Sequence, residues 1–344
     1  MRIGINILYL IPGRVGGTET YARELIPYLA KKHELIIFCG REAAPTFSGP
    51  NIQVVTLPIY SESRAMRLLA EQTILPILCI TKKIDVLFSL GYSAPFIHPC
   101  PSVVTIHDLN WYYHPEDFTW LERTIWQFLV RGSAKFSNHI ITDSAFSADS
   151  IQKILGIKKS KVTSILHGVP KIINTMPTDL GYPYLFTVMA DYPHKNFSTL
   201  LQVFAQLKLK FPTLHLVVCG LGRKIVDHKE NVKILGYVTR AELASLYRGA
   251  KVFVFPSAYE GFGYPVLEAM SYGTPVVSSS SSSLTEVVGD GGILVESYAV
   301  AQYVKAISQL LDSESLRNKM IAKGNKRVSE LKWSDTATKT LEIL

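Results

Sequence analysis

Residues 259–277 read YEGFGYPVLEAMSYGTPVV and join a glycine-rich turn to the start of a predicted helix. An apolar run typical of a β-strand, KVFVF at 251–255, precedes them, and Gly273-Thr274-Pro275 ends the helix. Glu260 and Glu268 stand on the two sides of the turn. The amides and the dipole at a helix N-terminus favour negative charge. The pattern therefore predicts a loop for a ligand that carries an anionic group beside many hydroxyls, as a nucleotide diphosphate sugar does.

Short apolar runs and helical segments alternate along the rest of the chain. This alternation is typical of parallel sheets built from βαβ units. The predicted strands are 3–8, 35–39, 53–57, 86–89, 103–107, 140–144, 184–188, 214–219, 232–235, 252–255, 275–278 and 292–295. The predicted helices include 19–32, 197–210, 240–248, 265–272, 299–311, 314–330 and a final helix in the tail. Pro27 lies inside the first helix, where we expect a bend.

The length of 344 residues exceeds a single ordinary core and suits two domains. Residues 170–183 are rich in proline and weakly periodic, so we predict a linker there. The predicted division is a Rossmann-like domain over 1–169, a second one over 184–330 and a final helix over 331–344. The predicted fold class is α/β, with two doubly wound parallel sheets that face each other across a cleft, because ligands of open α/β sheets bind at the carboxyl ends of the strands.

The net charge of +8 favours anionic partners, but no block of five or more like charges indicates a nucleic-acid-binding arm. The four cysteines have neither metal-ligand nor redox spacing, which favours a reducing cytoplasm. Asn6 and Pro12 interrupt the apolar N-terminus, so no signal peptide is predicted. No run reaches the roughly 18 apolar residues of a membrane span. We therefore expect a cytoplasmic protein that is soluble or peripheral to the membrane.

Further candidate residues follow other predicted strands. Because the carboxyl ends of parallel strands lie at one sheet edge, their side chains and amides can act together. A lysine at a helix start opposes the helix dipole, and a bound diphosphate would reverse that effect. A histidine there can donate or accept a hydrogen bond. The candidates are Gly16, Gly17, His107, Asp108, Lys195, Gly222, Arg223, Tyr237 and Val238.

The run from Glu260 to Met270, EGFGYPVLEAM, resembles the signature of the retaining glycosyltransferases of family 4, which have the GT-B fold. The Gly16-Gly17 loop, the pair His107-Asp108 and the segment around Lys195 are similar to other motifs of this family. His194 departs from the family pattern, where arginine is usual, and Met189 stands where some members have a second cation. The missing charge could then come from Arg223.

The resemblance implies a role for each matching residue. It implies three catalytic residues: His107 near the transferred sugar, Lys195 at the leaving diphosphate and Glu260 at the donor sugar. Glu268 would hold the ribose hydroxyls with both carboxylate oxygens. The implied substrate-binding residues are Gly16, Gly17, Asp108, Gly222, Arg223, Tyr237, Val238, Gly261, Phe262, Gly263, Tyr264, Val266 and Glu268. In the GT-B fold, the last helix crosses back to the N-terminal domain.

The implied activity is retaining transfer of a hexose-type sugar from a UDP-, GDP- or dTDP-sugar to a glycan or lipid-linked acceptor, in cell-surface polysaccharide or glycoconjugate synthesis. The resemblance implies no cofactor, and we see no Asp-x-Asp triplet for a metal. Three alternatives remain open from the residues: a sugar-nucleotide epimerase of the same fold, an NAD-type oxidoreductase and a non-catalytic nucleotide-binding protein.

Two segments allow two interpretations each. Residues 61–83 mix basic and apolar side chains, so they predict either a membrane-surface helix that serves a lipid-linked acceptor or a core-packing helix interrupted by Pro76. Residues 278–283 are six serines, which predict either a phosphate-contacting loop or a polar loop that caps the next helix.

Overall fold

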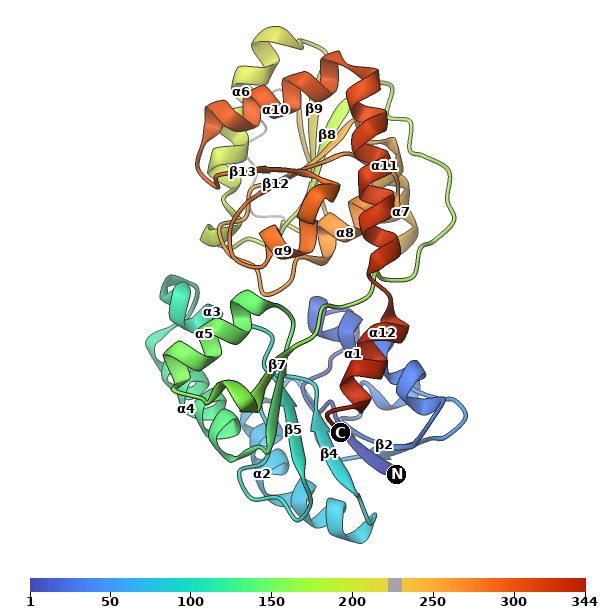
Figure 1. Ribbon diagram of the computed structural model, residues 1–344, viewed down its shortest axis with the longest axis vertical. Coiled ribbons are helices and arrows are strands. Elements are labelled where there is room, and N and C mark those ends of the chain that lie inside the picture. The colour runs from blue at the N-terminus through green and yellow to red at the C-terminus, as the bar shows by residue number, and fades with distance from the viewer. Residues whose placement is uncertain (222–230) are drawn as a thin grey trace. The chain divides into compact units, whose positions relative to one another are not determined.

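The computed structural model describes residues 1–221 and 231–344, which fold into two units, each a parallel sheet covered by helices (Figure 1). Unit 1 comprises Met1–Gly168 and Lys332–Leu344, and unit 2 comprises Val169–Leu331. The predicted fold class, α/β with two doubly wound parallel sheets, is confirmed. The final helix, α12 (Trp333–Leu341), belongs to unit 1 and packs beside α1 (Gly17–Ala30) (Figure 1).

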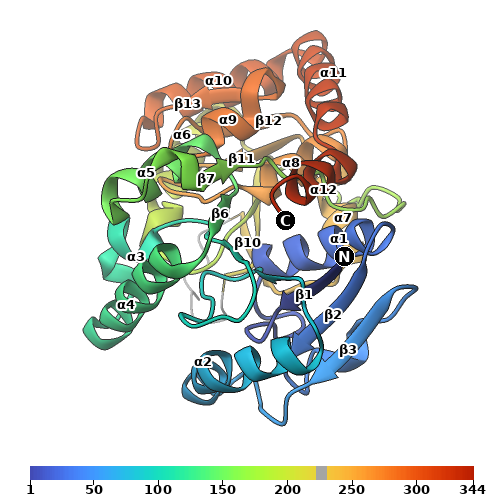
Figure 2. The ribbon, with the colours of Figure 1, turned by 60° about the horizontal axis from the view of Figure 1, so that its bottom comes forward.

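The sheet of unit 1 has seven parallel strands in the order β3-β2-β1-β4-β5-β6-β7, and Figure 2 shows β1, β2 and β3 next to one another. The strand order reverses between β1 and β4. The inner strands are mostly apolar and, apart from Arg2 at the start of β1, are buried at every position, as expected for a sheet covered on both faces. The strands are β1 (Arg2–Asn6), β2 (Glu34–Cys39), β3 (Ile52–Thr56), β4 (Val86–Ser89), β5 (Ser102–Thr105), β6 (His139–Thr142) and β7 (Val162–Ser164).

The helices of unit 1 begin and end at local signals. Thr119 and Glu122 form a capping box at the start of α4, and Ser144 caps α5, which ends at the left-handed Gly156. Besides α1 and α12, the helices are α2 (Arg64–Thr81), α3 (Asn110–Tyr113), α4 (Trp120–Phe136) and α5 (Ala145–Leu155), with short 3-10 turns at Ala44–Thr46, Pro115–Asp117 and Lys159–Lys161.

Both prolines inside predicted helices are accommodated. Helix α1 continues through Pro27, and the expectation that Pro76 interrupts the 61–83 segment is wrong, because α2 runs through it. A proline removes one backbone hydrogen bond from a helix. In α2, Leu75 and Cys79 on either side of the proline are buried in the core, and this packing offsets the lost bond.

The sheet of unit 2 has six parallel strands in the order β10-β9-β8-β11-β12-β13, and its order reverses between β8 and β11. Its core contains Leu185, Val218, Val254 and Val277 from the four central strands. The strands are β8 (Tyr184–Val188), β9 (His215–Cys219), β10 (Val232–Gly236), β11 (Val252–Phe255), β12 (Val276–Ser279) and β13 (Ile293–Val295).

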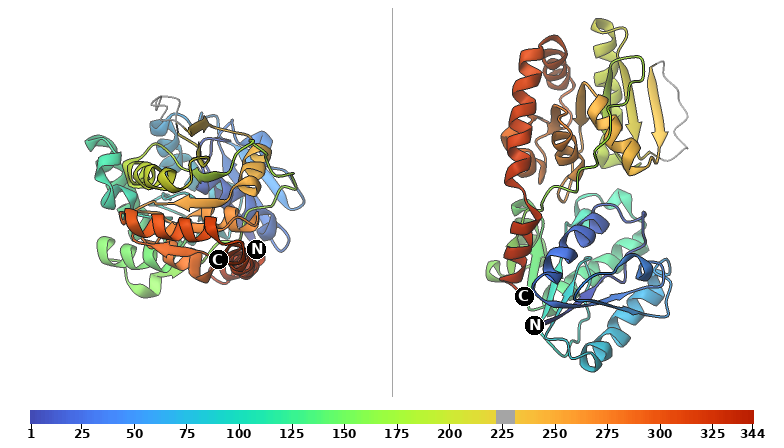
Figure 3. Two further views of the ribbon diagram at one scale, coloured as in Figure 1. Left: turned by 90° about the horizontal axis from the view of Figure 1, so that it is seen from above. Right: turned by 90° about the vertical axis from the view of Figure 1, so that its right-hand side faces the viewer.

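Six α-helices are described in unit 2, outside residues 222–230. Helices α6 and α10 pack against each other, as Figure 3 shows, and α11 packs against α8. The helices are α6 (Phe197–Lys210), α7 (Arg240–Gly249), α8 (Tyr264–Ser271), α9 (Leu284–Val288), α10 (Val300–Asp312) and α11 (Glu314–Glu330), with 3-10 turns at Pro193–Lys195 and Gly289–Gly291.

Candidate functional site

Two of the predicted catalytic residues form an ion pair in unit 2. Lys195 follows β8 and Glu260 follows β11, the two neighbouring strands between which the strand order reverses. The Lys195 Nζ lies 2.8 Å from Glu260 Oε1, and the side chains are only 17 % and 12 % exposed. Ligands of open α/β sheets bind outside the carboxyl ends of the strands at such a reversal. The pair therefore stands where a ligand site is expected.

Asn196 fixes the loop that carries Lys195. Its backbone is left-handed, with φ 60°, a conformation that asparagine tolerates better than most residues. Its side-chain amide donates to the carbonyls of Pro256, at 3.2 Å, and Ser297, at 2.7 Å. Asn196 thus joins the loops that follow β8, β11 and β13. Sequence reasoning did not include it among the site residues, although an asparagine just before a helix is a recognisable signal.

The glycine turn leads directly into α8. Gly263 has φ 105° and is the N-cap of the helix. Phe262 and Tyr264 are buried and their rings meet edge to face at 5.0 Å. Gly261 beside them is half-buried. The amide of Val266 donates to the carbonyl of Gly263, so this predicted ligand contact is already engaged within the first helical turn.

The serine run braces this turn from β12. Ser282 Oγ accepts from the amide of Glu260 at 2.8 Å, and Ser283 Oγ donates to the carbonyls of Glu260 and Phe262, each at 2.9 Å. The last serine of the run, Ser283, stands at the N-cap position of α9, but its side chain makes no capping bond to that helix. These two hydroxyls instead hold the backbone on either side of the glycine turn.

Glu268, the second predicted carboxylate, lies on α8. One carboxylate oxygen accepts a hydrogen bond from the hydroxyl of Tyr247 at 3.0 Å. Burial raises the pKa of Glu268, and this effect outweighs the Tyr247 hydrogen bond and the charge of Arg240, both of which lower it. The carboxylate is thus held in place from α7 and partly desolvated, which strengthens any hydrogen bond that it accepts from a ligand hydroxyl.

The remaining predicted residues of unit 2 follow β9 and β10. Gly222 and Arg223 lie outside the described residues. Tyr237 is 86 % exposed and Val238 is half-buried, both directly after β10. An exposed aromatic ring at the carboxyl end of a strand is available to stack on a ligand.

A pocket opens at the same sheet edge on the loops after β11, β12 and β13. It adjoins the Glu260 loop through Ala258 and the Asn196 contacts through Ser297. Hydroxyl, carboxylate and aromatic groups line it, and groups of this kind bind sugar rings. The lining residues are Ala258, Ser280, Ser281, Glu296, Ser297, Tyr298 and Ala299.

In unit 1, the predicted Gly16-Gly17 loop follows β1, at the point where this sheet also reverses its strand order. Both glycines are exposed, and Gly16 has φ 60°. The carboxylate of Glu19 accepts from the amide of Gly13 at 2.7 Å and pairs with Arg23 at 2.6 Å. Glu19 thus folds the loop against the start of α1.

His107, predicted as catalytic, is buried in a network of its own unit. Its Nδ1 lies 2.8 Å from Asp143 Oδ2, and its Nε2 lies 2.9 Å from the carbonyl oxygen of Leu90. Both partners are acceptors, so both ring nitrogens carry a proton and the ring is an imidazolium. Burial alone lowers the pKa of His107, but the charge and hydrogen bond of Asp143, with the Leu90 carbonyl, outweigh it and raise the pKa.

Asp143 connects a second histidine to this network. His167 Nε2 lies 3.1 Å from Asp143 Oδ1, and all three side chains are almost fully buried. Burial by itself raises the pKa of Asp143, but the two imidazoles outweigh it and hold this pKa well below its usual range. The rings of Tyr21 and Trp333 both stack on His167, with ring centroids 4.5 Å and 5.5 Å away. These contacts connect α1 and α12 to the network.

Asp108, the neighbour of His107, shapes its own loop. Its Oδ1 accepts from the amide of Asn110 at 3.1 Å, the bond of an Asx turn. Burial raises the pKa of Asp108 and outweighs the hydrogen bond and the charge of His107, which lower it. Its contacts within the chain are therefore those of a loop-fixing residue.

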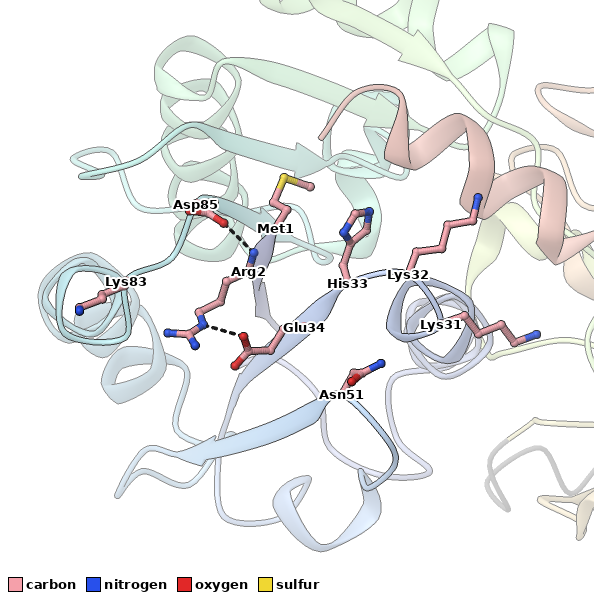
Figure 4. Close-up of a pocket in the computed structure, with 9 residues that line it drawn as sticks. All are labelled: Met1, Arg2, Lys31, Lys32, His33, Glu34, Asn51, Lys83 and Asp85. Carbon is pink, nitrogen blue, oxygen red and sulfur yellow. Dashed lines mark hydrogen bonds and ion pairs between the residues drawn. The ribbon is translucent and has the colours of Figure 1, made fainter.

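A second pocket lies at the opposite, amino edge of the unit 1 sheet (Figure 4). Arg2 pairs with Glu34 at 3.0 Å and its amide donates to Asp85, as the dashed lines show. Ligands of such sheets bind at the carboxyl edge, so this pocket is not a candidate active site. Its lining residues are Met1, Arg2, Lys31, Lys32, His33, Glu34, Asn51, Lys83 and Asp85.

The described part of the chain contains no group of three or more His, Cys, Asp and Glu side chains that could hold a metal ion.

Gly263 allows a direct test of the turn. A Cβ at this position would lie 2.6 Å from Leu284 Cδ2, and φ is 105°. Gly273 has φ 76°, but a Cβ there meets nothing closer than 3.9 Å. We expect Gly263→Ala to lower the free energy of unfolding by about 2–4 kcal/mol, the sum of the backbone and overlap penalties, and Gly273→Ala by about 1–2 kcal/mol. Hydrogen exchange of α8 peptides measures the stability loss in both variants. Equal losses would contradict the predicted steric overlap with Leu284.

Two family profiles match the chain. The profile described as Glycosyl transferases group 1 matches residues 170–327, and the profile described as Glycosyltransferase Family 4 matches residues 15–171. Together they cover both units, apart from the first residues and the tail.

Relatives of similar sequence agree with these family profiles, and solved structures share the fold. The O-antigen chain mannosyltransferase B of Escherichia coli is 31 % identical over 272 residues, which are 70 % of this chain and 69 % of that protein. The O-antigen chain mannosyltransferase RfbU of Salmonella typhimurium is 28 % identical over 318 residues, 83 % of this chain and 85 % of that protein. The structure of sucrose-phosphate synthase from Thermosynechococcus elongatus superposes with a TM-score of 0.78 at 18 % identity, covering 100 % of this chain and 98 % of that one, which shows the GT-B fold.

Proposed function

Because the chain belongs to glycosyltransferase family 4 and is a glycosyltransferase, we propose that it transfers a hexose from a nucleotide diphosphate sugar to a glycan or lipid-linked acceptor in cell-surface polysaccharide synthesis. Mannose is the proposed sugar, since both relatives named above are O-antigen chain mannosyltransferases. Of the four hypotheses drawn from the residues, family membership supports transfer rather than epimerisation, hydride transfer or silent binding.

The Lys195–Glu260 pair is the observation that carries this proposal. The leaving diphosphate gains negative charge as the glycosidic bond breaks, and a fixed cation placed there lowers the barrier. Lys195 supplies that ammonium, and Glu260 holds it at 2.8 Å from one carboxylate oxygen. The dipole of α8, which begins beside Gly263, adds positive potential at the same sheet edge.

The two glutamates take separate tasks in this proposal. Glu260 contacts hydroxyls of the donor sugar, and Glu268, fixed by Tyr247, accepts from the ribose hydroxyls. Glu260 is paired with Lys195, so we do not assign it the role of a nucleophile. We propose retention of the anomeric configuration, with the donor phosphate helping to accept the proton of the acceptor hydroxyl, and no need for a metal or other cofactor.

We also propose a cytoplasmic location and a peripheral contact with the membrane. The four cysteines are free thiols, which supports a reducing compartment.

A donor panel tests the proposal. Calorimetry with GDP-mannose, UDP-glucose, dTDP-glucose and NADH should show binding of at least one sugar nucleotide, GDP-mannose first, and none of NADH. Glu268→Gln should weaken that binding about 10- to 100-fold, because a hydrogen bond to a charged group contributes about 1.5–3 kcal/mol. Glu314→Gln, at an exposed glutamate in the first turn of α11, is the matched control and should bind normally.

Turnover separates transfer from binding. Mass spectrometry of a lipid-linked oligosaccharide fraction incubated with enzyme and donor should show one added hexose. Absence of heat with every sugar nucleotide would reject the proposed donor class, and donor binding without any transferred hexose would reject the proposed acceptor.

A further inference from the structure

The pocket on the loops after β11, β12 and β13 of unit 2, here the β12–β13 pocket, offers a free aromatic ring and a free carboxylate. Tyr298 is 67 % exposed, and Glu296 is exposed as well. Within the described part of the chain, neither side chain has a hydrogen-bonding, ionic or stacking partner. A ligand can therefore engage both groups without displacing an existing contact.

Hydrogen bonds fix the floor of this pocket before any ligand binds. The side-chain amide of Asn196 donates to the carbonyl of Ser297 at 2.7 Å, and the hydroxyls of Ser281 and Ser297 are hydrogen-bonded to each other. The amide of Ser280 donates to the carbonyl of Val295 at 2.8 Å. These bonds join the loops after β12 and β13 to the loop that carries Lys195. A preformed pocket of this kind loses little conformational entropy when it binds a ligand.

Strand order places the pocket next to the proposed donor site. The order is β10-β9-β8-β11-β12-β13, and Figure 1 shows β12 and β13 beside each other. In the proposed function, Lys195 and Glu260 hold the diphosphate and the donor sugar at the reversal between β8 and β11. Glu268, which binds the ribose in that proposal, is held by Tyr247 of α7, the helix that follows β10. The nucleoside is thus assigned to the β10 side, whereas the pocket extends from Ala258 toward β13 on the other side.

The side chains that line the pocket suit a neutral sugar ring. The C–H face of a pyranose packs on an aromatic ring such as that of Tyr298. Its hydroxyls can donate to the Glu296 carboxylate and exchange hydrogen bonds with the three serine hydroxyls of the lining. The pocket volume of about 470 Å³ lies within the range of small-ligand sites, about 300–1,000 Å³, and is large enough for a sugar ring.

Other ligand classes match this lining less well. A phosphate or an acidic sugar would meet the carboxylate of Glu296, and no described residue that lines the pocket is a cation. A lipid chain would find only two aliphatic side chains, Ala258 and Ala299. The described part of the chain also contains no helix that is long and apolar enough to cross a bilayer.

We propose that the β12–β13 pocket binds a neutral hexose residue of the acceptor glycan, with the sugar ring stacked on Tyr298 and its hydroxyls on Glu296. The assignment rests on the proposed function, since a glycan acceptor supplies sugar residues besides the one that carries the reacting hydroxyl. It gives unit 2 a second saccharide site, separate from the donor sugar at Glu260. None of the residues carried over from the family resemblance lines this site.

Saturation-transfer NMR of the full chain, without donor, tests the proposal. The neutral probes methyl α-mannoside, mannotriose and maltotriose should include at least one that receives saturation, whereas mannose 6-phosphate should receive none. Tyr298→Ala should weaken binding of the best neutral probe roughly tenfold, because the stacking surface is lost, and Tyr298→Phe should retain most of it. Glu296→Gln should weaken that probe roughly tenfold or more and should allow mannose 6-phosphate to bind.

The control is Leu209→Ser, which removes an 86 % exposed side chain from the last turn of α6 and should bind the probes as the parent protein does. Tyr298→Ala should keep the parent melting temperature and bind GDP-mannose normally in calorimetry, and in steady-state kinetics it should raise KM for the acceptor but not for the donor.

The outcomes separate this site from the proposed function. Donor binding without saturation of any neutral probe, or probe binding that survives Tyr298→Ala/Glu296→Gln, would overturn the pocket assignment and leave sugar transfer intact. Competition between GDP-mannose and the neutral probe would assign the pocket to the donor sugar and overturn the proposal equally. Probe binding with no heat from any sugar nucleotide would reject the proposed donor class while keeping a saccharide site in this pocket.

Discussion

Lys195→Met is expected to lower kcat/KM for sugar transfer at least about a hundredfold, a loss of about 2.7 kcal/mol or more of transition-state stabilisation. The ammonium is held 2.8 Å from Glu260 Oε1, and its side chain is only 17 % exposed, so it is largely shielded from water. The effect should appear in kcat more than in donor affinity, because charge on the leaving diphosphate grows only as the bond breaks. Steady-state kinetics with donor and acceptor varied separately measure both.

A double variant separates loss of the cation from exposure of its partner. Lys195→Met leaves the Glu260 carboxylate without its ion pair, and an unpaired, mostly buried charge is itself destabilising. Lys195→Met/Glu260→Gln removes that charge. We expect the double variant to regain melting temperature but not activity. Lys210→Met, which breaks an exposed pair with Asp312, is the matched control and should keep full activity. Recovery of activity in the double variant would contradict the role of Lys195.

The sequence was sufficient to predict most of the strands, because buried parallel strands are apolar on both faces. The run at 251–255, for example, is observed as β11 at Val252–Phe255. Strand β7 was not predicted. It has only three residues, only Val162 among them is buried, and lysines precede it, so it carries no apolar run. Pro76 was misjudged for a different reason, since local propensity ignores the tertiary packing that keeps α2 intact around it.

The site could be predicted only in part, because its contacts also depend on tertiary structure that local sequence does not reveal. Lys195 and Glu260 were found from their motifs, but their ion pair joins positions 65 residues apart and depends on β8 and β11 being neighbours. The bracing by Ser282 and Ser283 also depends on that strand order. Asp143 was hidden inside a predicted strand at 140–144. A carboxylate at the end of an apolar run, IITDS, was the signal that could have revealed it.

Asp143→Asn is expected to be the most destabilising single change in unit 1. The carboxylate lies between two buried imidazoles, 2.8 Å from His107 Nδ1 and 3.1 Å from His167 Nε2. Its removal leaves a buried imidazolium unpaired, and breaking a buried ion pair in this way costs about 3–5 kcal/mol. Asp149→Asn, which breaks an exposed pair with Lys153 on α5, is the matched control and should leave the free energy of unfolding nearly unchanged.

The loss of unfolding free energy in Asp143→Asn should change with pH in a direction that follows from the pKa shifts of His107 and Asp143. The folded pKa of His107 is raised, so its pairing contributes fully below the unfolded value of about 6.5 and is lost as pH rises through the folded value. The folded pKa of Asp143 is lowered, so its contribution is present above about 3.9 and is lost as pH falls further. The charged or titratable groups around His107 include Tyr21, Tyr92, Asp108, Asp143 and His167.

The stability gap between the parent protein and Asp143→Asn should therefore be widest between about pH 4 and 6.5 and should narrow at higher pH, as the variant's imidazole becomes neutral. Hydrogen exchange of β5 and β6 peptides across this range measures the gap within unit 1, and NMR titration of labelled histidines follows the ring protons directly. A gap that stays constant with pH would show that the network is held together by neutral hydrogen bonds, and the imidazolium assignment for His107 would then be wrong.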